Sequence, residues 1–469
     1  MDKHKSTFAL FFGTRDVFPD SLIAAARRES AAALEKLGHR VLMLDENATK
    51  AGAVQSPQEG AKYATFLAAN KGKYDGVIII LPNFGDENGA VAAFQDVDVP
   101  VLILAYPDEL NKMGPSVRRD GFCGKFSIMD VFCQYGIKFT SLKPHTVAVG
   151  SKAFVENIDY FDRVCRVVKG VRRMKVGSIG ARVTPFKTVR IDELALQKHN
   201  ITVETYDLSY VFDKMRKVSA DKIKAKMAVY ENAVNLCKTP AESKENLARM
   251  GVALDDLISE EGLDAIAIRC WFEVQQQFHI SPCMILGEMN NRFVEAACEV
   301  DLGNAIVMRA LRFATGQPSA CLDWNNNYGD DENKCILFHC GPVPMDLMTE
   351  KGTVTDHSMI ATVVGENKSF GPNVGRIKPM DFTFGSLLTR DGRVCCYVGE
   401  GAITKDPIAA DFFGCAGVAQ IDRLQDVLLH VGTMGHRHHV SISPGRVADP
   451  MREAMTHYLG FEVTMPQCS

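Results

Sequence analysis

Two acidic residues stand in surroundings where a charged side chain needs a partner. Glu299 lies in the run AACEV (296–300), and Asp323 lies in the run ACLDW (320–324); both runs are otherwise apolar or small. A carboxylate in such a place must be paired, must bind a metal ion, or must have a strongly shifted pKa. One such acid alone carries little weight, whereas two in similar settings are candidates for a shared cation site.

Imidazoles follow these carboxylates along the chain. His339 comes after a β-rich run, and a cluster with the sequence HRHH occupies 436–439. Carboxylate oxygens together with imidazole suit a divalent cation such as Mn²⁺, with Mg²⁺ the next choice. Each feature alone has a plainer explanation: a buried salt bridge for Glu299, a satisfied core histidine for His339 and a solvated basic turn for the cluster. The combination predicts a metal site.

Thiol ligation and hydrolase chemistry find less support. No Cys-x-x-Cys pair, Gly-x-Ser-x-Gly elbow or His-Glu-x-x-His helix is present. Cys298 adjoins Glu299, but neighbouring side chains on a strand point to opposite faces, so we expect Cys298 to serve in packing.

Composition limits the class of protein. The chain has 469 residues, 46% hydrophobic and 23% charged, which is the mix of a globular protein of about three domains at roughly 150 residues each. The net charge of −4 gives no general reason to bind nucleic acid or an anionic membrane. The longest aliphatic run, 77–81, is far shorter than the ~20 residues that cross a bilayer.

Compartment follows from the amino terminus and the thiols. The apolar run at 8–12 is too short for a secretory signal. The 14 cysteines lack the spacing of a disulfide-stapled domain and suit a reducing compartment. We therefore predict a cytoplasmic location.

The pattern of apolar and polar residues changes twice along the chain and indicates three parts. The first part, 1–170, alternates short apolar runs with amphipathic stretches, which predicts parallel strands with crossover helices. The predicted strands there are 8–12, 39–44, 76–81, 101–105 and 146–150, and the clearest helix is 21–37. A second α/β part, 171–325, carries Glu299 and Asp323, with strands at 201–206 and 264–269 and a long helical stretch at 219–250. Its GSIG turn (177–180) lacks the third glycine of a dinucleotide site, so no nucleotide cofactor is expected.

The third part, 326–469, is rich in short β runs and holds the His438–His439 pair. Predicted strands are 335–339, 359–364, 382–390 and 393–399, followed by a helix at 450–459 and a strand at 461–465. Glycine, proline and aspartate separate these runs, which is typical of an antiparallel barrel or sandwich.

A set of short motifs, in order, resembles the L-fucose isomerase family and, more distantly, L-arabinose isomerase. The motifs are RRDGFCGK (118–125), GSIGAR (177–182), PC (282–283), CEVD (298–301), LDW (322–324) and HH (438–439). The resemblance implies an α/β chain with two doubly wound Rossmann-like domains followed by a C-terminal antiparallel barrel-like domain. It also implies a homo-oligomer, often a hexamer, that interconverts an aldose and a ketose. In that family a Glu, an Asp and a late His hold Mn²⁺, and the two carboxylates double as the acid and base.

Matched position by position, the family's ligands fall on Glu299, Asp323 and the histidine pair. Glu299 and Asp323 are then both catalytic and metal-binding residues. The imidazole ligand is His439, with His438 as its rival and otherwise a substrate contact.

Two further residues match substrate-contacting positions. His339 corresponds to an additional histidine ligand of the arabinose-type enzymes, so the resemblance assigns it a polar contact to substrate. Arg15 falls where the family places a substrate-contacting arginine that can serve a neighbouring subunit.

The sequence departs from the family in ways that leave the sugar open. It is shorter than the fucose enzymes, and Trp271 and Trp324 are its only tryptophans, so no sugar-stacking tryptophan comes from the amino-terminal domain. The substrate is then a fucose- or arabinose-type sugar, a pentose or an acidic hexose derivative. Arg118, Arg119 and Lys125 could receive an anionic tail or form a solvated face. The alternative outside catalysis is a sugar-binding or regulatory protein of the same fold.

Overall fold

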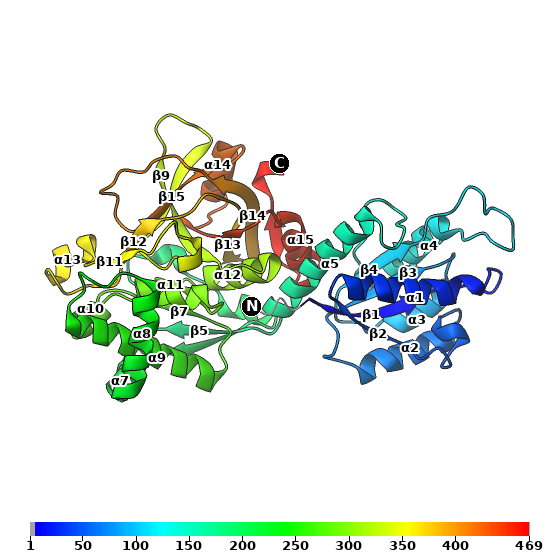
Figure 1. The fold of residues 1–469 in the computed structure, drawn as a ribbon, viewed down its shortest axis with the longest axis horizontal. Coiled ribbons are helices and arrows are strands. Elements are labelled where there is room, and N and C mark those ends of the chain that lie inside the picture. The colour runs from blue at the N-terminus through cyan, green and yellow to red at the C-terminus, as the bar shows by residue number, and fades with distance from the viewer. Residues whose placement is uncertain (1–4, 469) are drawn as a thin grey trace. The chain divides into compact units, whose positions relative to one another are not determined.

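The computed structural model describes residues 5–468 and divides into two compact units, Met1–Lys169 and Gly170–Ser469 (Figure 1). Each unit is built around a four-stranded parallel sheet, and the second unit adds an antiparallel barrel.

The first unit has helices on both faces of its sheet. The strand order is β2-β1-β3-β4, all parallel, with β1 (Thr7–Phe12), β2 (Arg40–Met43), β3 (Gly76–Leu81) and β4 (Val101–Ala105). Alternate residues of β1 enter different cores: Phe8 and Leu10 pack with α1 (Ser21–Lys36) and α5 (Lys152–Val171). Ala9 and Phe11 pack with α2 (Pro57–Ala69), α3 (Glu87–Phe94) and α4 (Gly121–Gln134). Burial on both faces explains why β1 and β3 are apolar throughout.

The predicted fifth strand of this unit, 146–150, is wrong. The segment has no strand structure; its Val147 N–H donates to the Ala105 carbonyl at 2.9 Å, and the only β-bridge nearby joins Leu102 to Thr140. Two valines separated by Ala148 are too few to continue a strand, and Gly150 adopts a left-handed φ of 78° just before α5.

The second unit repeats the parallel arrangement in the order β6-β5-β7-β8. Its strands are β5 (Lys175–Ile179), β6 (Thr202–Tyr206), β7 (Ala265–Ile268) and β8 (Glu295–Ala297). The helices are α6 (Glu193–Gln197), α7 (Leu208–Arg216), α8 (Ala220–Ala233), α9 (Ala241–Glu261), α10 (Glu273–Phe278), α11 (Cys283–Asn291) and α12 (Leu302–Thr315). The predicted helical stretch 219–250 is therefore two helices, because Pro240 cannot continue a helix and instead precedes the start of α9.

Six antiparallel strands close the barrel of the second unit. They run β15-β10-β9-β16-β13-β14, and β14 pairs back to β15. The bounds are β9 (Ala320–Asn327), β10 (Lys334–His339), β13 (Met380–Arg390), β14 (Arg393–Ile403), β15 (Cys415–Gln420) and β16 (His439–Pro444). Short strands β11 (Thr353–Val354), β12 (Asn373–Arg376) and β17 (Glu462–Thr464) extend the sheet, and α14 (Leu424–Thr433) and α15 (Ala448–Glu453) accompany it.

The predicted strand 359–364 is also wrong: it is helix α13 (Ser358–Val364). Its sequence MIATVV favours a strand by composition. The His357 ring nitrogen caps the helix instead, accepting the Ile360 N–H at 3.4 Å. Local capping has outweighed the β-branched composition here.

The architecture confirms the predicted class, an α/β chain with two parallel sheets and a C-terminal antiparallel barrel. The Rossmann-like description and the division at 170 and 325 into three domains stay predictions. Within residues 5–468, no helix has the length and apolar character needed to span a bilayer.

Candidate active site

Glu299 lies on a tight turn between β8 and α12. Glu299 and Val300 both have left-handed backbone conformations, with φ of 51° and 58°. The turn is fixed at both ends: the Val300 N–H donates to the Ile268 carbonyl of β7 at 3.2 Å, and the Asp301 side chain caps α12 by accepting the Asn304 N–H at 3.0 Å. The carboxyl end of a parallel sheet is where such folds bind ligands.

This turn overturns the expectation that Cys298 points away from Glu299. The Sγ of Cys298 and a Glu299 oxygen belong to one buried group of neighbouring ligand atoms. The alternation of faces holds only in extended backbone, and the left-handed conformation at Glu299 ends it.

Strand pairing brings Asp323 beside His439. Asp323 of β9 lies directly opposite His439 of β16 and, on its other side, Phe338 of β10. Directly opposed residues of antiparallel strands present their side chains on the same face. Asp323 Oδ1 consequently lies 3.4 Å from His439 Nε2.

The two carboxylates meet at the same imidazole nitrogen. Glu299 Oε2 lies 3.8 Å from His439 Nε2 and 3.5 Å from His339 Nε2. Ligand atoms of Glu299, His339 and His439 all lie within 4.8 Å of one another, and all three residues are buried. The structure therefore brings together Glu299, Asp323, His439 and His339, which are separated along the sequence.

Three buried atoms of this cluster lack a hydrogen-bond partner: Glu299 Oε2, Asp323 Oδ1 and His339 Nε2. Buried polar atoms in folded proteins are normally paired, so three orphans facing one point call for a partner that carries positive charge. Carboxylate oxygens and imidazole nitrogens form a donor set that divalent cations accept. The residues present thus fit a metal ion.

A third carboxylate, that of Asp301, orients His439. The His439 Nδ1–H donates to Asp301 Oδ2 at 2.8 Å, which leaves Nε2 directed at the cluster. Asp301 is held in turn by the buried Arg437 guanidinium and by Asn304, whose Nδ2 donates to Oδ2 at 2.7 Å. Carboxylate–histidine pairs of this kind fix the orientation and tautomer of a metal-binding imidazole.

Electrostatics keep Glu299 ionised. Burial alone would raise the pKa of Glu299, but the imidazoles of His339 and His439 outweigh it and lower the pKa to about 2. Burial would likewise raise the pKa of Asp301, and Arg437 with His439 brings it well below the usual range. Both carboxylates are charged at neutral pH.

His438 and His439 differ in position. The His438 side chain is 46% exposed and its Nε2 lies 3.7 Å from Asp323 Oδ1, whereas His439 is buried and faces both carboxylates. His438 precedes β16, and its carbonyl accepts the Trp324 N–H at 2.9 Å. The geometry favours His439 as the ligand and leaves His438 at the rim, although the roles themselves stay predictions.

A cavity of about 350 Å³ opens onto Glu299, Asp323 and His339. Aromatic side chains form much of its wall: Phe186, Trp271, Phe272 and Phe338. The Trp271 indole N–H also donates to Glu299 Oε1 at 3.4 Å. A small polar centre within an apolar and aromatic wall suits a ligand of sugar size.

Two family models match the chain, one in its N-terminal part and one in its C-terminal part. Residues 9–172 match the family model "Fucose/sulfoquinovose isomerase, N-terminal domain", and residues 337–466 match "L-fucose isomerase, C-terminal domain". The chain belongs to the L-fucose isomerase family. It is accordingly an enzyme of the aldose–ketose isomerase class.

Curated relatives of this isomerase are sulfoquinovose isomerases. Those of Priestia aryabhattai and Priestia megaterium are each 23% identical over 394 residues, which is 83% of this chain and 85% of theirs. That of Alkalicoccus urumqiensis is 23% identical over 59% of this chain and 61% of its own. Glu299 and Asp323 lie in the segment between the two family models, whereas His339 and His439 lie within the second.

Arg15 belongs to the first unit of the isomerase. Its Nε donates to the Gly85 carbonyl at 3.0 Å, its Nη2 lies 3.3 Å from Glu87 Oε1, and its guanidinium stacks 4.1 Å from the centre of the Phe84 ring. These contacts hold a half-exposed cation in one orientation. Its contact to substrate stays a prediction.

The basic residues of the RRDGFCGK motif have separate environments. Arg118 is exposed and bonds to Asp120 at 2.7 Å, as a solvated residue would. Lys125 is buried, so the solvated-face reading is wrong for it; its Nζ donates to the His145 carbonyl at 2.8 Å, and burial lowers its pKa to about 8. Arg119 stacks on Tyr106, 4.8 Å from the ring centre.

Sequence reasoning gave no role to Asp301, Arg437 or Cys270. A signal for the first two was present, since Asp301 belongs to the CEVD motif and Arg437 stands within the histidine cluster. Their pairing joins positions far apart in sequence, so only the fold reveals it. Nothing in the residues around Cys270 indicates its contact with Glu299.

Proposed function

We propose that this isomerase is metal-dependent and moves the carbonyl group of an open-chain sugar between C1 and C2 through a cis-enediol. The observation that carries the proposal is the set of buried, unpaired atoms around one imidazole: Glu299 Oε2, Asp323 Oδ1 and His339 Nε2 around His439. We propose Glu299, Asp323 and His439 as the ligands, Mn²⁺ as the preferred ion and Mg²⁺ or another divalent cation as a substitute.

The carboxylates have a second task in this proposal. The proton at the carbon next to a carbonyl is weakly acidic, so a positioned base must remove it while the developing charge on oxygen is stabilised. The divalent ion that Glu299, Asp323 and His439 would hold would supply that stabilisation as a Lewis acid. One of Glu299 and Asp323 takes the carbon proton and the other manages the hydroxyl proton. The face of the sugar that is presented decides which does which.

His339 and the rim residue His438 offer ring nitrogens that bind and orient sugar hydroxyls. Arg15 is proposed, from the family resemblance alone, as a substrate-contacting cation that can serve the site of a neighbouring subunit. Trp271 and its aromatic neighbours provide faces for the C–H groups of a sugar and keep bulk water from the reacting carbons.

For the substrate we place sulfoquinovose first, because the relatives whose alignment covers 83% of this chain are sulfoquinovose isomerases. A fucose- or arabinose-type sugar is second, supported by the family model of the C-terminal domain. Arg15 and Arg119 are cations of the kind that an anionic sugar would need.

The test uses protein stripped with a chelator and reloaded with Mn²⁺ or Mg²⁺. Incubation with sulfoquinovose, fucose, arabinose and unmodified hexoses is followed by an assay for new ketose. We expect turnover only with metal, and its loss in Glu299→Gln. Full turnover in metal-replete Glu299→Gln would refute the proposal. Binding of these sugars without any ketose, in wild-type protein with every cation, would favour the sugar-binding alternative.

We also propose a cytoplasmic homo-oligomer, with a hexamer as the expected size. Support comes from the family resemblance and from the thiols, since buried free cysteines such as Cys321 and Cys396 suit a reducing compartment. Light scattering on purified protein measures the assembly, and a monomeric mass at working concentration would contradict it.

A further inference from the structure

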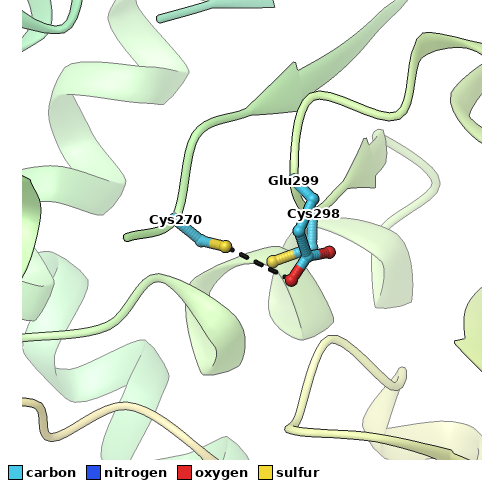
Figure 2. A group of neighbouring side chains, drawn as sticks. All are labelled: Cys270, Cys298 and Glu299. Carbon is cyan, nitrogen blue, oxygen red and sulfur yellow. Dashed lines mark hydrogen bonds between the residues drawn. The ribbon is translucent and has the colours of Figure 1, made fainter. Parts of the chain in front are cut away.

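The two oxygens of Glu299 face different kinds of neighbour. Oε2 faces the imidazoles of His339 and His439, as described above. Oε1 accepts from the Cys270 thiol and from the Trp271 indole N–H, each at 3.4 Å, and Cys298 lies on the same side as Cys270 (Figure 2). The two Sγ atoms and a Glu299 oxygen all lie within 4.8 Å of one another, and the three residues are buried.

More sulfur lies next to this pair. Cys340 Sγ lies 3.1 Å from Cys283 Sγ, and both residues line the same cavity as Cys270. Single buried cysteines usually act as small apolar residues. Cys270 and Cys298 differ, because their Sγ atoms lie beside an ionised carboxylate and are placed to share an ion with it.

Three of these four thiols line the cavity. Cys270, Cys283 and Cys340 form part of its wall, as does Glu299. Cys298 is buried and is not part of the wall, so an ion reaches its Sγ past Cys270 and Glu299, whose ligand atoms lie within 4.8 Å of it.

We propose that Cys270 Sγ, Cys298 Sγ and Glu299 Oε1 form a second cation site, selective for a thiophilic divalent ion such as Zn²⁺ or Cd²⁺, and that its occupation inhibits the isomerase. Thiolate ligands select Zn²⁺ over Mn²⁺ and Mg²⁺, and two sulfurs with one carboxylate leave one position of a tetrahedron. Binding involves no electron transfer: the ion replaces two thiol protons, which pass to the buffer.

Inhibition follows from the shared carboxylate. An ion on Oε1 draws electron density from Glu299 and fixes its orientation, so Glu299 loses basicity at Oε2. This part rests on the proposed function, in which Oε2 serves catalysis. The binding part does not, because the thiols hold the ion whether or not the protein turns over a sugar.

The binding test uses full-length, Mn²⁺-loaded protein in which the exposed cysteines Cys123, Cys133, Cys237 and Cys468 are serine, to remove background thiols. Cd²⁺ is titrated in, and the ultraviolet thiolate-to-cadmium charge-transfer band is recorded. We expect a saturable band that Cys270→Ser and Cys298→Ser each weaken, with at least tenfold lower affinity. Cys396→Ser, a buried thiol in the barrel, is the matched control and keeps the band. An unchanged band in both site variants overturns the proposal.

The inhibition test compares Zn²⁺ inhibition at increasing Mn²⁺. We expect inhibition to persist at saturating Mn²⁺ in wild type and to need at least tenfold more Zn²⁺ in Cys298→Ser. Inhibition that Mn²⁺ reverses, and that Cys298→Ser does not change, means that Zn²⁺ occupies the carboxylate–imidazole cluster and overturns the proposal. Cys298→Ala repeats the test should the serine variant fail to fold, as judged by circular dichroism. A wild type without isomerase activity on any sugar would defeat the proposed function, while the cadmium band still decides the site.

Discussion

The two parallel sheets have the same strand order but different chemistry at their carboxyl ends. In both, the first strand lies between the second and third, and the fourth lies at the edge. In the first sheet β4 leads to Tyr106, whose hydroxyl donates to Glu29 at 3.0 Å, and then to a long loop. In the second, β8 leads at once to the turn with Glu299 and Asp301. In the described part of the chain, every group of side chains able to hold a metal lies in the second unit.

The strand order therefore determines where a site can form, at the carboxyl ends of the strands, and the structure packed beside that edge determines which side chains reach it. Of the three proposed metal ligands, the second sheet offers only Glu299, and the barrel strands β9 and β16 add Asp323 and His439. Asn304 of α12 ties the two parts together: its Oδ1 accepts from Ser441 of β16 at 2.8 Å, while its Nδ2 donates to Asp301. The first sheet has the same kind of edge, but its unit contains no barrel strands, and the described residues of that unit form no such cluster.

The largest effect is expected from replacing Asp323, a carboxylate that the barrel contributes to the site. Asp323→Asn keeps the size of the side chain and the β9 pairing but removes a negative charge and a base. We expect kcat at saturating Mn²⁺ and sugar to fall on the order of a thousandfold. The control is Glu462→Gln, a 51% exposed carboxylate of β17, which should leave kcat unchanged. A kcat within about threefold of wild type for Asp323→Asn would exclude the carboxylate from catalysis.

Next comes the buried ion pair behind the site. Arg437→Met leaves Asp301 charged and without its guanidinium partner in a fully buried place. We expect the free energy of unfolding to fall by about 3–5 kcal/mol. Trp271 and Trp324 both belong to the second unit, so tryptophan fluorescence during urea denaturation reports that unit alone. Arg446→Met, at a half-exposed ion pair, serves as the control and should change stability by less than about 1 kcal/mol.

A smaller effect is expected from Asp301, and it tests whether this carboxylate orients His439. Asp301→Asn keeps the helix cap but weakens the bond that orients His439. We expect Mn²⁺ affinity, measured by calorimetry, to fall by about ten- to a hundredfold. Asp192→Asn changes a cap of the same kind on α6, far from any candidate ligand in sequence, and should leave Mn²⁺ affinity as it is. Equal losses in both variants would point to general destabilisation.

The smallest effect belongs to the first unit, which has its own titrating group. Burial lowers the pKa of His39 below its ordinary value of 6.5, while its ring Nδ1 contacts the Ser6 carbonyl at 3.0 Å. The unfolded chain therefore binds the proton more readily than the folded one. The His39 contribution is complete above pH 6.5 and is lost as pH falls through the lower folded pKa.

Calorimetry of the full chain between pH 7.5 and pH 5 measures this slope. His39→Asn, which keeps a donor toward Ser6, should flatten the decline in unfolding temperature. An identical decline in the variant would assign the effect to other groups.

Features could be predicted from the sequence when the residues that determine them lie close together along the chain. Local signals served well: apolar runs placed β1, β3, β4 and β7, and the β-rich texture predicted the barrel. Glu299 and Asp323 could be singled out because a carboxylate among apolar residues is informative at close range, and the family resemblance added His439. The roles of these residues remain to be tested.

Other features depended on the fold. Helix α13 has the composition of a strand, and only the capping contact from His357 reverses that preference. Cys298 was expected to face away from Glu299 because extended backbone was assumed, whereas two consecutive left-handed residues turn the chain. The Asp301–Arg437 pair and the thiols around Glu299 join segments that no local pattern connects.

The left-handed turn at Glu299 and Val300 also affects how the site is formed. Two non-glycine residues in left-handed conformations cost free energy, about 1–3 kcal/mol each. Here β7 and the first turn of α12 impose them, so folding of the polypeptide meets this free-energy cost before any ion binds. In the proposed metal enzyme, a protein emptied by a chelator would therefore keep Glu299 in its binding orientation and take up a new ion without rebuilding the turn.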